Sequence, residues 1–178
     1  MILVFGSLNV DLFFNVTSLP APGETVLCPK YNFRPGGKGA NQAAAAASFG
    51  GQVEMIGSVG NDVFASPVIE ALKKSGVGVS CISQRPGITG TACVMVEKGG
   101  ENQIVVASGA NLETLSDQVD DNWLNEDTIL VLQMEVPIHE IRKIIFRARE
   151  AGSKILLNLA PALTIDDDVL KLCDFLIL

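Results

Sequence analysis

The sequence lacks several features that would place it in familiar functional classes. No run of lysines and arginines with interleaved aromatics is present, and the 178 residues carry a formal net charge of −7. Because nucleic-acid backbones attract cationic surfaces, this balance predicts no nucleic-acid partner. No apolar run reaches the ~20 residues of a membrane-spanning helix, and the beginning has no basic segment or long apolar core of a secretory signal. We therefore expect no membrane partner and a cytoplasmic protein.

Residues for metal and disulfide chemistry are also sparse. Four cysteines, Cys28, Cys81, Cys93 and Cys173, lie far apart without a Cys-x-x-Cys pair, and His139 is the only histidine. Metal centres and disulfide frameworks need clustered ligands or thiols, so we predict reduced thiols and no metal site. We expect His139 at the surface, in the first turn of a helix. The phosphate loop Gly-x-x-x-x-Gly-Lys-[Ser/Thr] and the nucleophile elbow Gly-x-Ser-x-Gly are absent.

Hydrophobic content is 48%, which is typical of a globular chain. Apolar strands alternate with helices, which predicts an α/β fold with a mostly parallel sheet covered on both faces. The expected strands are 2–5, 53–59, 128–133, 155–159 and 174–178, and the expected helices are 40–49, 61–75, 137–150 and 166–172. Two hairpin-like pairs, 11–17 with 25–33 and 91–97 with 102–107, predict a small antiparallel sheet beside the main layer. Asn61 or Asp62 is the expected cap of the helix after 53–59.

The most informative stretch is Arg34-Pro35-Gly36-Gly37-Lys38-Gly39-Ala40-Asn41-Gln42, which runs into five alanines. Its glycines allow sharp turns and close approach of a ligand, and alanine favours a helix that starts at once. A helix start offers unpaired N–H groups, and Lys38 and Asn41 add a cation and an amide. The stretch favours a site for a hydroxyl-rich small molecule or an anion. A plain glycine-rich turn before a helix explains the glycines equally well.

Two further segments place polar side chains at the ends of expected strands, where open α/β sheets bind ligands. Asn9 and Asp11 follow the first strand and share a face if the segment is extended, so they could hold vicinal hydroxyls. Turn capping by the two side chains is the alternative. Glu135 follows the strand at 128–133, and its alternative role is that of an acid at a helix start.

Taken together, these residues resemble the PfkB carbohydrate kinases, a family that includes the ribokinases. The resemblance rests on several motifs in matching order. They are Gly6-Ser7-Leu8-Asn9-Val10-Asp11, Pro20-Ala21-Pro22-Gly23-Glu24-Thr25, Gly36-Gly37-Lys38-Gly39-Ala40-Asn41-Gln42-Ala43, Gly57-Ser58-Val59-Gly60-Asn61-Asp62, Gly109-Ala110-Asn111, Gln133-Met134-Glu135 and Asn158-Leu159-Ala160-Pro161-Ala162.

The resemblance implies a three-layer α/β/α core, here 1–11, 34–88 and 108–178. It also implies a β-sheet lid over a sugar, here 12–33 and 89–107, through which two copies form a homodimer. It assigns substrate binding to Asn9, Val10, Asp11, Glu135 and the segment Gly37, Lys38, Gly39, Ala40, Asn41. The implied reaction is ATP- and Mg²⁺-dependent phosphorylation of a ribose-like sugar.

The family's catalytic base lies in a Gly-Ala-Gly-Asp segment, and an Asn-x-x-Glu motif lies near Mg²⁺ and phosphate. Neither motif occurs in this sequence. We therefore expect the C-terminal part of the fold to be missing, no catalytic base in this chain, and an inactive isolated chain that associates or is poorly soluble. The alternative is a pseudokinase module that binds a sugar or regulates a partner.

Overall fold

The computed structural model describes residues 1–178, and its core is a six-stranded sheet, sheet A, in the order β10-β9-β8-β1-β4-β5. Every neighbouring pair in it is parallel, as the alternation of strands and helices predicts. Its strands are β1 (Ile2–Phe5), β4 (Val53–Gly60), β5 (Gly78–Arg85), β8 (Ile129–Gln133), β9 (Lys154–Asn158) and β10 (Phe175–Ile177).

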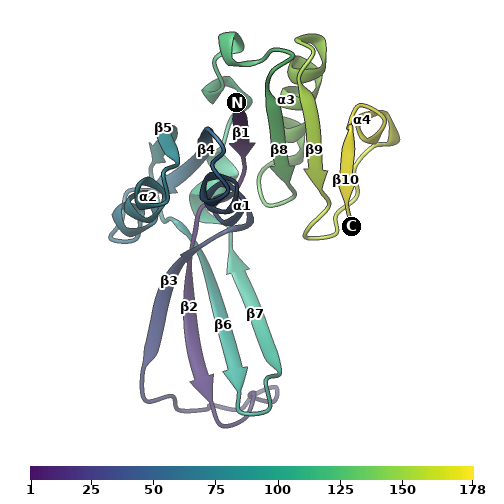
Figure 1. Ribbon diagram of the computed structural model, residues 1–178. Coiled ribbons are helices and arrows are strands. Elements are labelled where there is room, and N and C mark those ends of the chain that lie inside the picture. Colours follow the sequence, from purple (N-terminus) through teal and green to yellow (C-terminus); the bar gives the residue numbers. More distant parts are fainter.

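Helices cover both faces of sheet A, which confirms the three-layer core (Figure 1). Alternate residues of β1 point to opposite faces, because side chains alternate along a strand. Val4 packs in the cluster that holds α1 (Lys38–Ser48) and α2 (Ala65–Lys74). Leu3 and Phe5 pack in the cluster that holds α3 (Ile138–Glu150). A short helix, α4 (Asp167–Leu170), packs beside α3. No helix is long and apolar enough to cross a membrane.

Four further strands form sheet B, which stands away from the core (Figure 1). They are β2 (Asn9–Val16), β3 (Tyr31–Gly36), β6 (Gly90–Glu97) and β7 (Asn102–Ala107), in the order β3-β2-β6-β7. The two hairpin-like pairs are antiparallel as expected, but β2 and β6 pair in parallel. The expected antiparallel sheet is therefore mixed, because β2 and β6 both leave the core in the same direction.

Several expected boundaries are wrong for local reasons. β3 begins at Tyr31 rather than at 25, and it continues through Pro35, which an edge strand tolerates because its N–H groups need no partner. α2 begins at Ala65, although the Asp62 carboxylate does accept the N–H groups of Phe64 and Ala65. β5 was not expected, because its sequence mixes small polar and apolar residues without a clear period.

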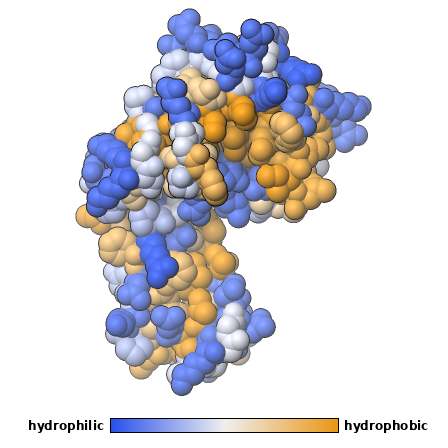
Figure 2. All heavy atoms as spheres, viewed as in Figure 1, coloured by the Kyte–Doolittle hydropathy of each residue, from blue (hydrophilic) through white to orange (hydrophobic).

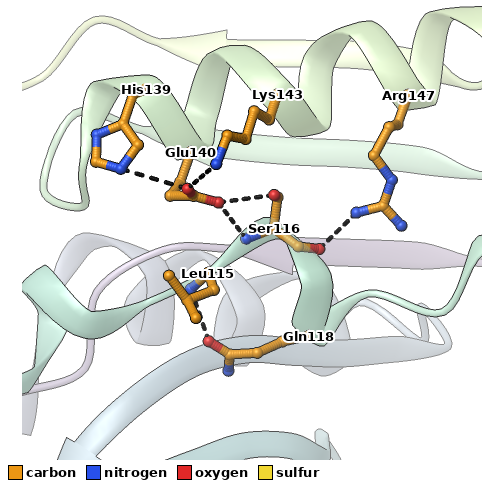
Figure 3. Close-up of polar contacts among 7 residues, drawn as sticks. All are labelled: Leu115, Ser116, Gln118, His139, Glu140, Lys143 and Arg147. Atoms are coloured by element: carbon orange, nitrogen blue, oxygen red, sulfur yellow. Dashed lines mark hydrogen bonds and ion pairs between the residues drawn. The ribbon is translucent and has the colours of Figure 1, made fainter.

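Three 3₁₀ turns occupy the connection from β7 to β8, which the sequence analysis left without structure. They are η1 (Gly109–Glu113), η2 (Ser116–Gln118) and η3 (Asp121–Trp123). Figure 3 shows how α3 holds this connection. Glu140 Oε2 accepts hydrogen bonds from Ser116 N and Ser116 Oγ, each at 2.7 Å, and Lys143 Nζ lies 2.6 Å from Glu140 Oε1.

The same connection is also held by sheet A. Arg147 of α3 donates to the carbonyl of Ser116, whereas on the sheet side the Gln118 amide donates to the carbonyls of Gly57 and Cys81. The connection is therefore fastened to both α3 and sheet A, although it lacks regular structure. His139 is exposed, as expected, with Nε2 3.3 Å from Glu140 Oε1.

The buried Glu140 carboxylate makes stability depend on pH. Burial alone would raise its pKa, but hydrogen bonds from Lys143 and Ser116 lower it from 4.5 to about 2. The carboxylate therefore stabilises the fold fully above its unfolded pKa, and this contribution is lost as the pH falls toward 2. We expect Glu140→Gln to lower the free energy of unfolding by about 1–3 kcal/mol at neutral pH.

Urea unfolding at several pH values checks this prediction, with Glu150→Gln as the control because Glu150 is exposed at the end of the same helix. The difference between wild type and Glu140→Gln should stay constant down to about pH 5 and shrink below it. A difference that did not change with pH would contradict the assigned role of the charge.

Candidate functional site: a polar cavity at the strand ends

A cavity of about 490 Å³ opens where β1, β8 and β9 end, between the core and sheet B. This is the edge at which α/β sheets bind ligands. Its walls combine apolar side chains with a few polar ones, which suits a small polar ligand. The lining residues are Asn9, Lys38, Val106, Ser108, Asn111, Leu112, Met134, Glu135, Val136, Pro137, Ile138, Pro161 and Leu163.

Glu135 joins three segments at the floor of this cavity. Its Oε2 atom accepts hydrogen bonds from Ser7 Oγ at 2.5 Å and from the backbone N–H of Lys38 at 3.0 Å. Its Oε1 atom has no hydrogen bond, and Lys38 Nζ is 3.9 Å away. One carboxylate oxygen therefore maintains the fold, while the other is open to a ligand donor.

The start of α1 lies directly against the end of β1. The N–H groups of Gly39 and Ala40 donate to Ser7 Oγ and to the Ser7 carbonyl. Gly37 is the N-cap, with φ +94°, a conformation that glycine adopts readily. The sequence predicts unpaired N–H groups at this helix start. Instead, the backbone N–H groups of Lys38, Gly39 and Ala40 donate hydrogen bonds to Glu135 and Ser7, and only the N–H of Gly37 has no partner.

Asn9 is oriented by Asn111, which lies in η1. The backbone N–H of Leu8 donates to Asn111 Oδ1 at 2.8 Å, so Asn111 must present its Nδ2 donor to Asn9 Oδ1, at 2.7 Å. The Asn9 Nδ2 group then remains as an unpaired donor at the cavity. A side chain at Gly90 would lie 2.1 Å from Asn9 Oδ1, so the arrangement depends on glycine there.

Asp11 lies on β2, two residues beyond Asn9, and it is not among the residues that line the cavity. Its carboxylate lies over Gly36, because a side chain at Gly36 would come within 2.2 Å of Asp11 Oδ2. The pKa of Asp11 is raised, first by burial and then by the charge of Glu135, while Lys38 opposes the shift. Two carboxylates and one ammonium therefore share the site.

The remaining predicted residues lie elsewhere. The Val10 side chain is buried in the core cluster under α1, so only its backbone is near the site. Asn41 lines a different hollow of about 260 Å³ between α1 and α2, and its assignment to the sugar stays a prediction. Ser7 and Asn111 occur in the quoted motifs but were given no role. Their importance comes from contacts between residues about 100 apart in sequence.

The donor set does not fit a magnesium site. No group of three or more histidine, cysteine, aspartate or glutamate side chains is arranged to hold a metal ion. Mg²⁺ binds through carboxylates and phosphate oxygens, and Asp11 and Glu135 are the only two carboxylates gathered at this site. These residues suit a neutral polyol better than a metal-bound phosphate.

The fold and site together define a class of protein: a three-layer α/β core with a polar cavity at its strand ends and a second sheet beside it. The model of the pfkB family of carbohydrate kinases matches residues 1–177. The chain belongs to this family.

The similar proteins include ribokinases. The chain is 34% identical to a ribokinase of Schizosaccharomyces pombe and 36% identical to one of Haemophilus influenzae, and it covers 58% of each. A crystal structure of ribokinase from Thermotoga maritima superposes with a TM-score of 0.89 at 34% identity, over 98% of this chain and 58% of that one. A ribokinase of Arabidopsis thaliana, solved with ribose and ATP, superposes with a TM-score of 0.85 at 30% identity, over 98% and 58%. The chain thus spans a little over half the length of these relatives.

The raised pKa of Asp11 predicts a conflict between stability and binding. Because folding raises this pKa, the ionised carboxylate destabilises the ligand-free fold at neutral pH. We expect Asp11→Asn to be at least as stable as the wild type at pH 7 in urea unfolding. This advantage should vanish as the pH falls below the pKa of an unperturbed aspartate, about 4. A variant markedly less stable at pH 7 would show that Asp11 supports the fold.

Proposed function

We propose that this chain binds a ribose-like sugar in the strand-end cavity, as the sugar-recognition part of an ATP-dependent sugar kinase. The observation that carries the proposal is the set of polar atoms that the fold leaves free there. Glu135 Oε1 is an acceptor there, and Asn9 Nδ2 and Lys38 Nζ are donors. Asp11 does not line the cavity, but its carboxylate is close enough to interact with the charges of Glu135 and Lys38 and adds a second acceptor beside it. A polyol, whose hydroxyls both donate and accept, matches such a mixed set.

The charge at the site favours a neutral sugar over a phosphorylated one. The pKa of Asp11 is raised first by burial and then by the negative charge of Glu135. An added phosphate would meet both carboxylates, and only Lys38 offsets them. The ribokinases and the deoxyribokinases among the relatives support a pentose as the substrate.

The chemical step would move the γ-phosphoryl group of ATP to a sugar hydroxyl, which requires a positioned nucleophile, a base and Mg²⁺. We assign substrate positioning to Asp11, Glu135 and Asn9, and we assign no catalytic base to these 178 residues. The alternative is a binding module without catalysis.

Ribose binding to the isolated chain tests the proposal. We expect ribose to raise the melting temperature of the wild type, and Asp11→Ala to abolish this rise because a buried sugar hydroxyl would lose a charged acceptor. Glu101→Ala, on the exposed β6–β7 turn, is the control and should respond like the wild type.

A ribose response that survives in Asp11→Ala would remove Asp11 from the site. A parallel assay with ATP, Mg²⁺ and ribose separates the two readings of the chain. Phosphorylation above background by these residues alone would contradict our proposal that they contain no catalytic base.

We also propose that sheet B acts as a lid and as the contact between two copies. Figure 2 shows hydrophobic residues along this sheet, in the lower half of the view. Ile104 and Val105 of β7 are 55% and 66% exposed, and Tyr31 and Phe33 of β3 are about as exposed. Apolar residues on the two edge strands of a sheet favour pairing with another chain.

Sedimentation over a range of protein concentrations tests the dimer. We expect Val105→Glu to shift the chain toward monomer, because burying an unpaired charge at an interface is unfavourable. Val63→Glu is the matched control, since Val63 is 81% exposed on the core. A wild type that is monomeric at every concentration, or equal effects of the two variants, would rule out this contact.

A further inference from the structure

A second hollow lies at the outer edge of sheet A, where β5 ends. Its volume is about 310 Å³, and all four residues that line it, Asn61, Gln84, Arg85 and Pro86, are non-hydrophobic. It shares no lining residue with the strand-end cavity. Neither the proposed sugar site nor the packing of the core uses these side chains.

Arg85 is the charged residue of this hollow. Arg142, Arg147 and Arg149 each pair with an aspartate, whereas Arg85 pairs with no carboxylate. Its Nε–H group is buried and has no hydrogen-bond acceptor. A buried donor on a permanently charged group is unfavourable without a partner, and the protein leaves the charge of this guanidinium group without compensation.

The amides around Arg85 contribute further donors. Gln84 Nε2 donates to Asn61 Oδ1 at 3.1 Å and to the Gly60 carbonyl at 3.4 Å. The bond to Asn61 occupies the carbonyl oxygen of the Asn61 amide and leaves the Asn61 Nδ2 group free to donate. Gln84 Oε1 is the one free acceptor, and it could pair with a protonated oxygen of a ligand.

We propose that this hollow binds a small oxyanion of the phosphate class, with Arg85 supplying the charge and Asn61 a second donor. Guanidinium groups bind phosphate oxygens with paired, charge-assisted hydrogen bonds. No acidic side chain lines the hollow to repel the anion, although the chain carries a net charge of −7.

The position of the hollow gives the anion a mechanical role. Arg85 ends β5, and residues 86–89 lead directly into β6 of sheet B. Asn61 N donates to the Gly87 carbonyl, and the Asp62 carboxylate accepts from Thr89 N at 2.8 Å and Thr89 Oγ1 at 2.7 Å. An anion held by Asn61 and Arg85 would add another link across this junction and stiffen the base of sheet B.

Titration calorimetry with inorganic phosphate, in low-salt chloride buffer, tests the proposal on the full chain. We expect Arg85→Gln and Asn61→Asp each to weaken phosphate binding at least about tenfold. Arg85→Gln removes the positive charge, and Asn61→Asp introduces a carboxylate that pairs with Arg85 and repels the anion. Lys74→Gln is the control, since Lys74 is exposed on α2 and forms no ion pair, and its affinity should stay within about twofold of the wild type.

Hydrogen exchange gives a second readout. Phosphate should slow exchange of the amides at 87–90 in the wild type and not in Asn61→Asp. That variant keeps the size of the side chain and provides a partner for Arg85, so it should fold even if Arg85→Gln does not. Unchanged affinity in both variants, or an equal loss in Lys74→Gln, would overturn the proposal.

Two further titrations identify the ligand and separate this site from the sugar site. The first compares the affinities of ribose 5-phosphate and inorganic phosphate. Tighter binding of ribose 5-phosphate that depends on Arg85 would identify the ligand as a sugar phosphate, and equal affinities would identify it as the free anion. Asp11→Asn should bind phosphate like the wild type, so failure of the sugar proposal would leave this one intact. A loss of phosphate binding in Asp11→Asn would place the anion in the sugar cavity and overturn the second site.

Discussion

The carboxylate of Glu135 is the contact on which the site depends. It accepts hydrogen bonds from the hydroxyl of Ser7 and the backbone N–H of Lys38, so it brings together the ends of β1 and β8 and the start of α1. Glu135 is 128 residues from Ser7 and 97 residues from Lys38 in sequence. A neutral side chain could fill the same space, but it would not accept two donors with a full charge while holding a second oxygen toward the cavity. The geometry of the site and its acceptor therefore come from one residue.

The polar atoms at the site divide into those that hold the fold and those that face the cavity. The same division appears in Asn9, whose carbonyl oxygen is held by Asn111 while its amide nitrogen is free. Because the orientation of the pair follows from the backbone N–H of Leu8, the donor at the cavity is set by the fold itself. Preorganised groups of this kind lower the entropy that ligand binding must overcome. The cavity is thus prepared for a ligand before one arrives.

The sequence predicted the parts of the fold whose signal is local. β1 and β8 are nearly continuous apolar runs because both faces are covered, and Glu135 and Asn9 follow from the rule that ligands bind at strand ends. β5 and the turns of 109–123 were missed because their order comes from distant partners, such as Gln118 with Gly57 and Cys81. The roles of Ser7 and Asn111 were missed for the same reason. The donors of the first turn of α1 were overestimated, since no local pattern shows that Ser7 and Glu135 take them.

Sheet B meets the core at a junction that would limit the proposed movement of this sheet over the cavity. The Asp62 carboxylate accepts from Phe64 and Ala65 at the start of α2 and from Thr89 just before β6. Burial alone would raise the pKa of this carboxylate, but these bonds lower it, so it stays ionised and the junction holds at neutral pH.

Asn9, in turn, is both the first residue of β2 and part of the cavity wall. A rotation of sheet B that keeps the Thr89 contact must therefore move Asp11 and Val106 more than Asn9, because they lie further along their strands or on the far edge of the sheet. Closure over a ligand would thus change the distance between Asp11 and Glu135, and with it the repulsion that raises the pKa of Asp11. A sugar hydroxyl that donates to one of the two carboxylates would offset part of that repulsion, so under the proposed lid movement ligand binding and closure would act on the same pair of charges.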